Sequence, residues 1–469
     1  MKDVSVTFCL NIEYLRFDRN LYGIIREIIR IGEKKMKDIE KSIYEHQNEI
    51  IEVIREGMKI PSVKGDAKEG APYGDDIKSM LEYALNLGKS WGLKTKNVDG
   101  RAGWVEIGEG ESMVAVLGHL DVVPEGTGWD YEPYGAEIHD GVLFGRGVAD
   151  DKGPTLGAMY ALKLIKEMQI PLKKRIRVIF GMDEEHGSSC IKHYIQCGEE
   201  IPEAGFTPDA EYPLIFFEKG IVNIKVGKKN IEQKDENIQK IEAGLAGNIV
   251  PPKCTITKKN GESIVVLGKD AHASTPWLGE SAVLNMVPIL EEMNPVGEVK
   301  SLLKFLAEKM EKEANGKNLG IYYQDEETGV TTVNLGMLTY NEEKLEFDLD
   351  IRYPKNGDAE EICNKVKEAV EECGLEILAT KKTDMLYIPK DSEVVTKLMN
   401  VYKEVTGDEN EALAIGGGTY AKMFPNMVAF GPIFPGMTAK IHQANEQMEI
   451  EQIMKSIVIS AKGILSLAE

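Results

Sequence analysis

Histidines and carboxylates in this chain stand in glycine- or proline-rich turns that directly follow apolar, strand-like segments. His119 and Asp121 come just after the apolar run 113–117, and the glycine-rich segment GRGVADDKGP then supplies Asp150. Ligands gather beyond the carboxyl ends of strands in open α/β sheets. Imidazole and carboxylate groups are the ligands that a borderline metal such as zinc selects. These residues therefore predict one part of a metal site.

Further candidate ligands follow other strand-like segments. Glu184 and Glu185 lie in the turn after the run 175–180. Asp209 stands between two prolines, and His442 is the only histidine in the last third of the chain. Several carboxylates in one crevice would repel one another and become partly protonated unless cations held them. Two histidines and three carboxylates suffice for a pair of metal ions that share one carboxylate.

Each of these residues also has a simpler interpretation. A single aspartate at a strand end is more often a turn or cap residue, and a single histidine beside a strand is more often structural. The joint placement in turns favours the metal site. By contrast, His139, His186 and His193 are predicted to be structural.

The elements that carry these residues alternate between strands and helices. The runs 113–117 and 175–180 are predicted strands, and apolar positions at helical spacing predict a helix over 152–168 between them. Such a strand–helix–strand unit implies a right-handed crossover and a parallel strand pair. The last helix is expected to begin near Glu446, with Asn445 as its cap.

The length of 469 residues exceeds what one ordinary core supports, so two domains are expected. The predicted class is α/β, with a discontinuous domain on an open, mostly parallel central sheet flanked by helices. Residues 36–217 form its first part, residues 388–469 form its second part, and residues 218–387 form an inserted α+β domain. Residues 1–35 carry a short amphipathic, basic pattern, which favours an accessory or spurious extension over a targeting role.

The composition excludes several classes of partner. A formal charge of −21 argues against nucleic acid, because phosphate binding needs clustered lysines and arginines. No window approaches the ~20 apolar residues of a membrane span, so no membrane partner is expected. Six cysteines without a C-x-x-C pair are most simply reduced thiols in the cytoplasm. Cys190 and Cys197 could share one helix face, but their spacing suits neither a zinc knuckle nor a disulfide framework.

Five motifs, taken in their order along the chain, resemble those of a known family. They are GHLDVVP, GRGVADDKGP, MDEEHGS, FTPDAEYP and IHQANE. Together they are similar to the cocatalytic zinc metallopeptidases, which include aminoacylases, carnosinases and PepV-type dipeptidases. The long insert, with LAGNIVPP, DAHAS, DIRYP and GGGTYA, is most similar to the PepV-type branch. The resemblance covers nearly everything from about Met36 to the end of the chain.

The resemblance implies a catalytic domain that holds two zinc ions, in place of which manganese or cobalt could also bind. Asp150 would bridge the two ions. His119 and Asp209 would complete the first site. Glu185 and His442 would complete the second.

The resemblance also assigns roles to the neighbours of these ligands. Asp121 would accept a hydrogen bond from His119 and fix its tautomer. Glu184 would be the general base that activates water. The peptide bond between Asp150 and Asp151 is expected to be cis.

The inserted domain is implied to act as a lid that supplies substrate-binding groups. His272 would donate to the oxyanion of the transition state. The groups that would hold the terminal carboxylate of the substrate are Arg352, Asn248, Gly416, Gly417, Gly418 and Thr419. An arginine suits that task through its bidentate fork. Without the resemblance, Arg352 is equally well a surface strand residue, Asn248 is more simply a loop residue, and the triple glycine is a turn.

Three functions are consistent with these features. The favoured one is a zinc-dependent cytoplasmic dipeptidase that acts as a monomer on unblocked dipeptides. The second is an N-acyl amino acid deacylase of the same fold, which the metal motifs do not separate from the first, although the lid motifs favour the dipeptidase. The third is a non-catalytic metal-binding relative. It is disfavoured because every expected catalytic position is filled.

Overall fold

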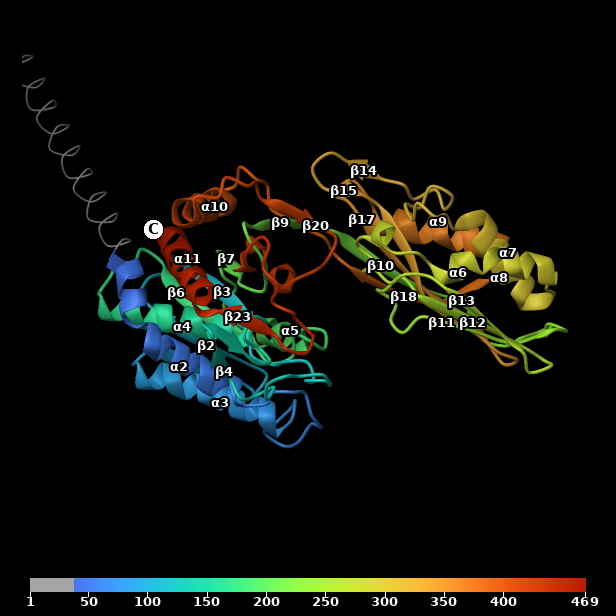
Figure 1. The fold of residues 1–469 in the computed structure, drawn as a ribbon. Helices are drawn as coiled ribbons and strands as arrows, with labels where there is room; N and C mark the ends of the chain where they lie inside the picture. The colour runs from blue at the N-terminus through green and yellow to red at the C-terminus, as the bar shows by residue number, and fades with distance from the viewer. Residues whose placement is uncertain (1–37) are drawn as a thin grey trace, which may run out of the picture. The chain divides into compact units, whose positions relative to one another are not determined.

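The computed structural model describes residues 38–469, so the extension expected over residues 1–35 lies outside the described part. The chain divides into two compact units (Figure 1). Unit 1 holds the described residues up to 214 together with residues 391–411 and 423–469. Unit 2 holds residues 215–390 and 412–422. The segment with the triple glycine thus groups with the second unit, whereas the sequence boundaries assign it to the first domain.

Unit 1 is built on a mixed sheet with helices packed against it. Its strands, in spatial order, are β1 (Lys94–Val98), β2 (Ala102–Ile107), β6 (Arg175–Gly181), β3 (Met113–His119), β7 (Ala204–Thr207) and β21 (Met427–Ala429). The last four run parallel to one another, and β1 and β2 form an antiparallel edge. Because β21 returns from the C-terminal part of the chain to pair with β7, the predicted discontinuous α/β architecture is confirmed.

The strand–helix–strand unit predicted around the first motif is present. β3 and β6 pair in parallel along their whole length, and α4 (Lys152–Glu167) connects them. Gly118 at the end of β3 has no room for a side chain: a Cβ there would lie 1.9 Å from Thr155 Oγ1 and 2.6 Å from Asp151 Oδ2. The glycine therefore lets the first turn of α4 approach the strand and brings Asp150 beside His119.

The remaining helices of unit 1 enclose this sheet. They are α2 (Gln47–Met58), α3 (Asp75–Ser90), α5 (Ser189–Gln196), α10 (Glu393–Thr406) and α11 (Ile450–Ala468), and residues 38–45 are also helical. The C-terminal helix α11, red in Figure 1, packs against α4, where a Cβ on Gly157 would lie 2.6 Å from Ile457. Among the described residues, no helix combines the length and apolarity needed to cross a bilayer.

The start of the last helix differs from the prediction. α11 begins at Ile450 rather than near Glu446, and residues 447–449 form β23, which pairs with β5 (Val142–Phe144). Asn445 does not cap the helix, because its side chain exchanges two hydrogen bonds with Asp130, of 2.7 and 2.8 Å. Residues 447–449, which the prediction placed in the helix, therefore form a strand instead.

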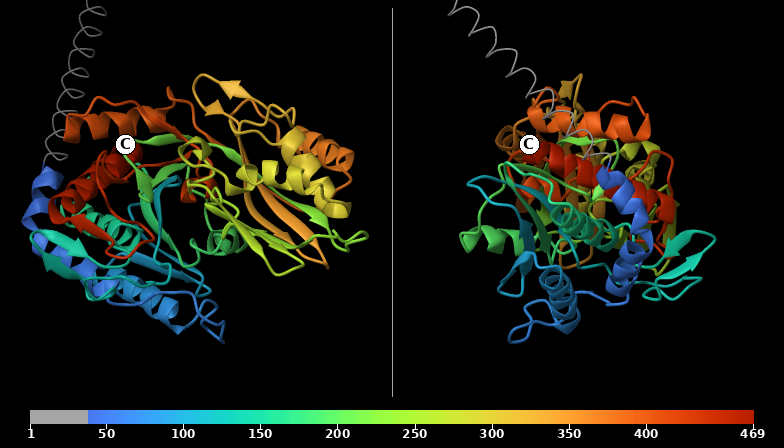
Figure 2. Two further views of the ribbon diagram at one scale, coloured as in Figure 1. Left: turned by 45° about the vertical axis from the view of Figure 1, so that its right-hand side comes forward. Right: turned by 90° about the vertical axis from the view of Figure 1, so that its left-hand side faces the viewer.

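Unit 2 is an α+β unit with its own core. Its antiparallel sheet has the order β13 (Ser263–Leu267), β12 (Lys253–Lys258), β11 (Ile238–Ala243), β16 (Thr332–Tyr340), β17 (Leu345–Tyr353), β10 (Gly220–Lys228) and β18 (Glu376–Thr383). Its helices, grouped over the sheet in Figure 2, are α6 (Ala282–Asn285), α7 (Val287–Met293), α8 (Gly297–Lys309) and α9 (Ala359–Glu372). Alternate residues of β10 (Val222, Ile224 and Val226) are buried in one apolar cluster with these helices.

Several short elements complete the two units. In unit 1 they are β4 (Glu137–His139), β8 (Ala210–Glu211) and β22 (Pro432–Ile433). In unit 2 they are β9 (Ile215–Glu218), β14 (Gln324–Asp325), β15 (Gly329–Val330), β19 (Leu386–Tyr387) and β20 (Leu413–Ile415). β20 pairs in parallel with β9, which is why the segment after residue 411 belongs to unit 2.

Candidate active site

Asp150 lies at the centre of the candidate metal ligands in unit 1. Its Oδ1 is 2.9 Å from Nε2 of His119, and its Oδ2 is 2.9 Å from Nε2 of His442. Asp150 and His119 are buried, whereas the side chain of His442 is 52% exposed. Each carboxylate oxygen of Asp150 therefore faces a different imidazole, which is the arrangement that one carboxylate needs in order to bind two cations.

The other predicted ligands lie on either side of Asp150. Both carboxylate oxygens of Glu185 are 3.1 Å from Nε2 of His442. Oδ2 of Asp209 is 3.9 Å from Nε2 of His119. The structure thus brings together all five residues predicted to bind metal, although they come from five segments that are far apart in the sequence.

Glu184 completes this group. One donor atom each from His119, Glu184 and Asp209 lie within 4.8 Å of one another, and the same holds for His119, Asp150 and Glu185. Glu184 is therefore close enough to the candidate ligands to exchange a proton with a molecule that they hold.

Asp121 connects the turn after β3 with the turn after β6. Its two carboxylate oxygens accept hydrogen bonds from the N–H groups of Glu184 and Glu185, at 3.0 and 3.2 Å. Its backbone carbonyl is 3.0 Å from Nδ1 of His119, and its carboxylate is 3.5 Å from the same nitrogen. The nearer acceptor for His119 is thus the main chain, and the carboxylate mainly fixes the turn with the two glutamates.

Burial and mutual repulsion shift the pKa values of the site carboxylates. Burial raises the pKa of Glu184 to about 7, against the opposing effect of His119. Burial and the charge of Asp150 raise the pKa of Asp209 well above its ordinary value. Burial acts in the same direction on Asp150, but hydrogen bonds from the two histidines outweigh it and lower its pKa. These carboxylates cannot all be ionised without added positive charge, so this donor set fits divalent cations.

Glu446 is a buried carboxylate of this site that the sequence interpretation missed. It accepts hydrogen bonds from the N–H groups of Gly147, Ala149 and Asp150, at 3.0 to 3.3 Å, and pairs with Nη1 of Arg146 at 2.7 Å. It therefore fixes the loop that carries Asp150. Its place in the same motif as His442 was the only available signal, since a charged residue before a helix is usually exposed.

The peptide bond between Asp150 and Asp151 is cis, as the resemblance implies. Asp151 is fully buried, and its Oδ2 accepts hydrogen bonds from the N–H of His119 at 3.1 Å and from Oγ1 of Thr155 at 2.8 Å. Asp151 therefore links the end of β3 to the first turn of α4, directly beside Asp150.

Arg352 is the centre of the candidate substrate-binding group in unit 2. It is buried on β17, and its Nε and Nη2 donate to the carboxylate of Asp350 at 2.8 and 3.2 Å. Its Nη1 donates to the carbonyl oxygen of Gly416 at 2.7 Å. Three of the five guanidinium N–H groups are used in these bonds, so the orientation of the side chain is fixed.

His272 and Asn248 lie on adjacent stretches of backbone. The N–H of Ala273 donates to the carbonyl oxygen of Asn248 at 2.9 Å. The N–H of Ser274 donates to Nδ1 of His272 at 3.3 Å, and Oγ of Ser274 lies 2.7 Å from the same nitrogen. Both contacts are consistent with a neutral ring that carries its proton on Nε2. Burial, together with the charge of Arg352, lowers the pKa of His272 and favours the neutral ring.

The triple-glycine loop lies against the same region of unit 2. A Cβ on Gly416 would be 2.6 Å from Cβ of Ser274, so only glycine allows this approach. Thr419, which follows Gly417 and Gly418, donates from its N–H and Oγ1 to the buried carboxylate of Glu218, at 3.0 and 2.5 Å. The structure therefore brings the predicted carboxylate-binding residues together within unit 2.

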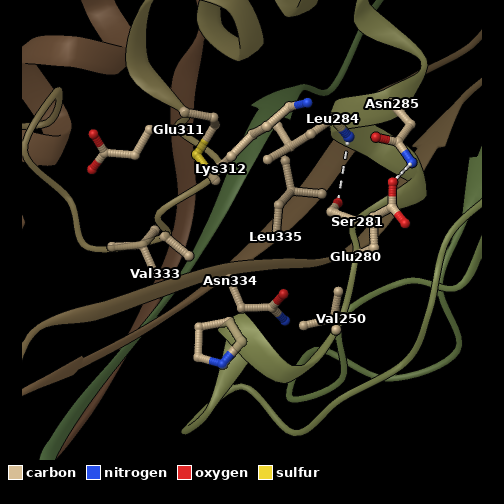
Figure 3. Close-up of a pocket in the computed structure, with 14 residues that line it drawn as sticks. Val250, Glu280, Ser281, Leu284, Asn285, Glu311, Lys312, Val333, Asn334 and Leu335 are labelled. Carbon is tan, nitrogen blue, oxygen red and sulfur yellow. Dashed lines mark hydrogen bonds between the residues drawn. The ribbon is translucent and has the colours of Figure 1, made fainter.

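A pocket of about 220 Å³ in unit 2 contains none of the predicted site residues (Figure 3). Glu280 and Asn285 on its wall bond to each other at 2.9 Å. Asn334 on the opposite wall donates to the carbonyl oxygens of Gly247 and Ile249, at 3.0 and 3.1 Å. The pocket is therefore not part of the candidate active site. Its residue Asn334 has an indirect role, because it holds the backbone on both sides of Asn248.

Comparison with known proteins gives a consistent result. Residues 115–466 match "Peptidase family M20/M25/M40". The "Putative dipeptidase YtjP" of Bacillus subtilis is 34% identical over 464 residues, which cover 92% of this chain and 99% of that protein. A "Putative dipeptidase" of Staphylococcus epidermidis is 32% identical over 463 residues, 91% of this chain and 98% of that protein.

Solved structures with the same fold have much lower sequence identity. Human carnosine dipeptidase 1 has a TM-score of 0.62 at 14% identity, over 92% of this chain and 98% of that chain. The dipeptidase Dug1p of Saccharomyces cerevisiae has a TM-score of 0.60 at 13% identity, over 92% and 98% of the respective chains. At these identities the likeness bears on the fold alone.

The position of Glu446 leads to a prediction. The substitution Glu446→Gln replaces one acceptor oxygen by an NH₂ group, which cannot accept from the loop that carries Asp150, and removes the charge that pairs with Arg146. We expect metal affinity to fall by about 10–100-fold, as for other residues that orient metal ligands. Equilibrium dialysis against buffered zinc measures this change.

A matched control is Glu449→Gln, because Glu449 is an exposed residue of the same segment. It should leave the metal affinity unchanged. Equal affinities for the wild type and the Glu446→Gln variant would show that Glu446 does not position Asp150.

Proposed function

The chain belongs to peptidase family M20/M25/M40 and is a hydrolase, and we propose that it is a dipeptidase that cleaves unblocked dipeptides with two metal ions. The observation that carries this proposal is the position of Asp150, whose two oxygens face His119 and His442. Relatives of nearly the same length, such as the dipeptidases named above, support the substrate class. A cytoplasmic location and a monomeric state are further parts of the proposal.

We assign Asp150 to both ions, His119 and Asp209 to the first ion, and Glu185 and His442 to the second. This ligand set suits zinc, and manganese or cobalt would also fit it. When bound, two such cations would polarise the scissile carbonyl and lower the pKa of a water molecule at the site.

Glu184 is the proposed general base. Its carboxylate lies beside the candidate ligands, where it can both accept and release a proton. It takes the proton of the attacking water and then delivers it to the leaving amine. Asp121 holds Glu184 in position through the N–H of that residue.

The residues of unit 2 are proposed to bind the substrate. His272, with its proton on Nε2, would donate to the oxyanion. Arg352, oriented by Asp350, would bind the terminal carboxylate, together with Asn248 and the loop Gly416–Thr419. Binding of the terminal carboxylate limits the leaving-group side of the scissile bond to one residue, which suits a dipeptide.

An N-acyl amino acid deacylase is the second candidate. It is favoured by one feature: Arg352 would recognise the carboxylate of an N-acyl amino acid equally well. The test is to assay the metal-loaded protein with an unblocked dipeptide and with its N-acetyl counterpart. Faster cleavage of the unblocked dipeptide supports the proposal, faster cleavage of the acetylated compound favours the deacylase, and no cleavage of either compound would overturn both.

Glu184→Gln tests the general base. The variant keeps the size of the side chain but cannot take a proton, so kcat should fall by about 10²–10⁴-fold. Metal content, measured by elemental analysis, should stay near that of the wild type. The control Glu109→Gln alters a glutamate whose side chain is 94% exposed, and it should change neither quantity. A fully active Glu184→Gln variant would remove Glu184 from this role.

Arg352→Lys tests recognition of the substrate carboxylate. Lysine keeps the positive charge but loses the planar fork that Asp350 and the Gly416 carbonyl orient. Hydrogen bonds to charged groups contribute about 1.5–3 kcal/mol, so kcat/KM for a dipeptide should fall by roughly 10–150-fold. The matched control is the same dipeptide with its carboxyl group amidated, for which the two proteins should differ little. An equal loss on both substrates would mean that Arg352 has a structural role.

A further inference from the structure

A second group of side chains that carry metal-ligand atoms lies within unit 1, apart from the candidate active-site ligands. It consists of Asp99 in the turn between β1 and β2, His193 on α5 and Cys197 at the end of α5. His193 and Cys197 are four residues apart, so they lie on one face of the helix. Asp99 comes from a distant part of the sequence, which is why the spacing of the cysteines gave no sign of this group.

Three donor atoms of this group converge on one point. Nε2 of His193 is 2.9 Å from Oδ2 of Asp99 and 3.2 Å from Sγ of Cys197. Sγ of Cys197 is 3.5 Å from the same Oδ2. The three atoms form a triangle. Imidazole nitrogen, thiolate sulfur and carboxylate oxygen are the three atom types that bind zinc in proteins, and the triangle has one of each.

The size of the triangle matches tetrahedral coordination. With Zn–N and Zn–O bonds of about 2.0–2.2 Å and Zn–S bonds of about 2.3 Å, neighbouring donors are separated by roughly 3.3–3.6 Å. The three observed separations of 2.9, 3.2 and 3.5 Å lie within about half an ångström of those values. Small rotations of the side chains would complete the fit, since that of Asp99 is 71% exposed and that of His193 is 28% exposed.

The geometry argues against a nucleophilic cysteine. A cysteine–histidine–aspartate relay uses both ring nitrogens, one facing the sulfur and the other facing the carboxylate. Here the same nitrogen of His193 faces both Asp99 and Cys197. Such an arrangement cannot pass a proton through the ring, but it is the arrangement of three ligands around one ion.

We propose that Asp99, His193 and Cys197 bind one further zinc ion, or a similar divalent cation that accepts thiolate, with the fourth position open to water. An aspartate and a thiolate balance the charge of the ion. The turn that carries Asp99 is held by the bond from Gly100 N–H to Asn97 Oδ1 at 2.7 Å, so the backbone beside one ligand is held before the ion binds.

The ion would act as a structural link within unit 1. It would join the β1–β2 turn to the C-terminal end of α5. The other end of α5 begins at Ser189, shortly after the turn that carries Glu184 and Glu185. This role is separate from the proposed hydrolysis, because none of the three ligands belongs to the active-site group.

Substitution with cobalt(II) tests this proposal, because a cobalt–thiolate bond gives a charge-transfer band in the near ultraviolet. The proposed active-site ligands contain no sulfur, so ions bound there cannot give this band. We expect the wild type to show the band at stoichiometric cobalt, and Cys197→Ser to lose it together with one bound ion per chain. Hydrolytic activity should remain unchanged in this variant.

Three further variants sharpen the test. Cys363→Ser removes a partly exposed thiol of unit 2 and should keep the band. Asp99→Asn and His193→Gln should weaken cobalt binding at this site by at least about 10-fold while the thiolate remains. A wild type without the band, or a band that persists in Cys197→Ser, would overturn the proposal.

A second measurement needs no substitution. Bound zinc should slow the alkylation of Cys197 by iodoacetamide. The alkylation rate is measured by mass spectrometry of the peptide that contains this residue. The alkylation rate should return to its higher value after chelation. Equal rates with and without zinc would also overturn the proposal. Neither readout requires catalysis, so the result is independent of the proposed dipeptidase activity.

Discussion

The close packing of buried carboxylates around Asp150 is the constraint on which the rest of unit 1 depends. Burial and repulsion raise the pKa values of Glu184 and Asp209, so this group is unfavourable unless positive charge is present. Carboxylates whose pKa values are shifted in this way cluster at functional sites. The fold supplies two imidazoles to it, and the remaining charge balance is what bound divalent cations provide.

Two further carboxylates make the geometry of this group rigid. Asp121 holds the turn with the two glutamates through backbone N–H groups, and Glu446 holds the loop before Asp150 in the same way. Glu446 comes from the C-terminal segment that also carries His442. That segment therefore supplies the candidate ligand His442 and also fixes the loop of Asp150. The candidate metal site thus depends on the return of the C-terminal segment to unit 1.

Metal binding and substrate binding are predicted for residues of different units. The predicted metal ligands belong to unit 1, and the predicted substrate-binding residues belong to unit 2. The pairing of β20 with β9 places the triple-glycine loop in unit 2, where the carbonyl oxygen of Gly416 accepts from Arg352. The residues assigned to the terminal carboxylate are thus oriented by contacts within one unit.

Local sequence patterns were enough to predict one part of this structure. The apolar runs that become β3 and β6, their parallel pairing and the candidate ligands in the turns after them were all predicted. A strand and the turn that ends it are encoded by neighbouring residues. The role of Glu446, the late start of α11 and the contact of Asp99 with His193 and Cys197 became apparent only from the folded chain. In each case the deciding contact joins segments far apart in the chain, and local periodicity carries no information about such contacts.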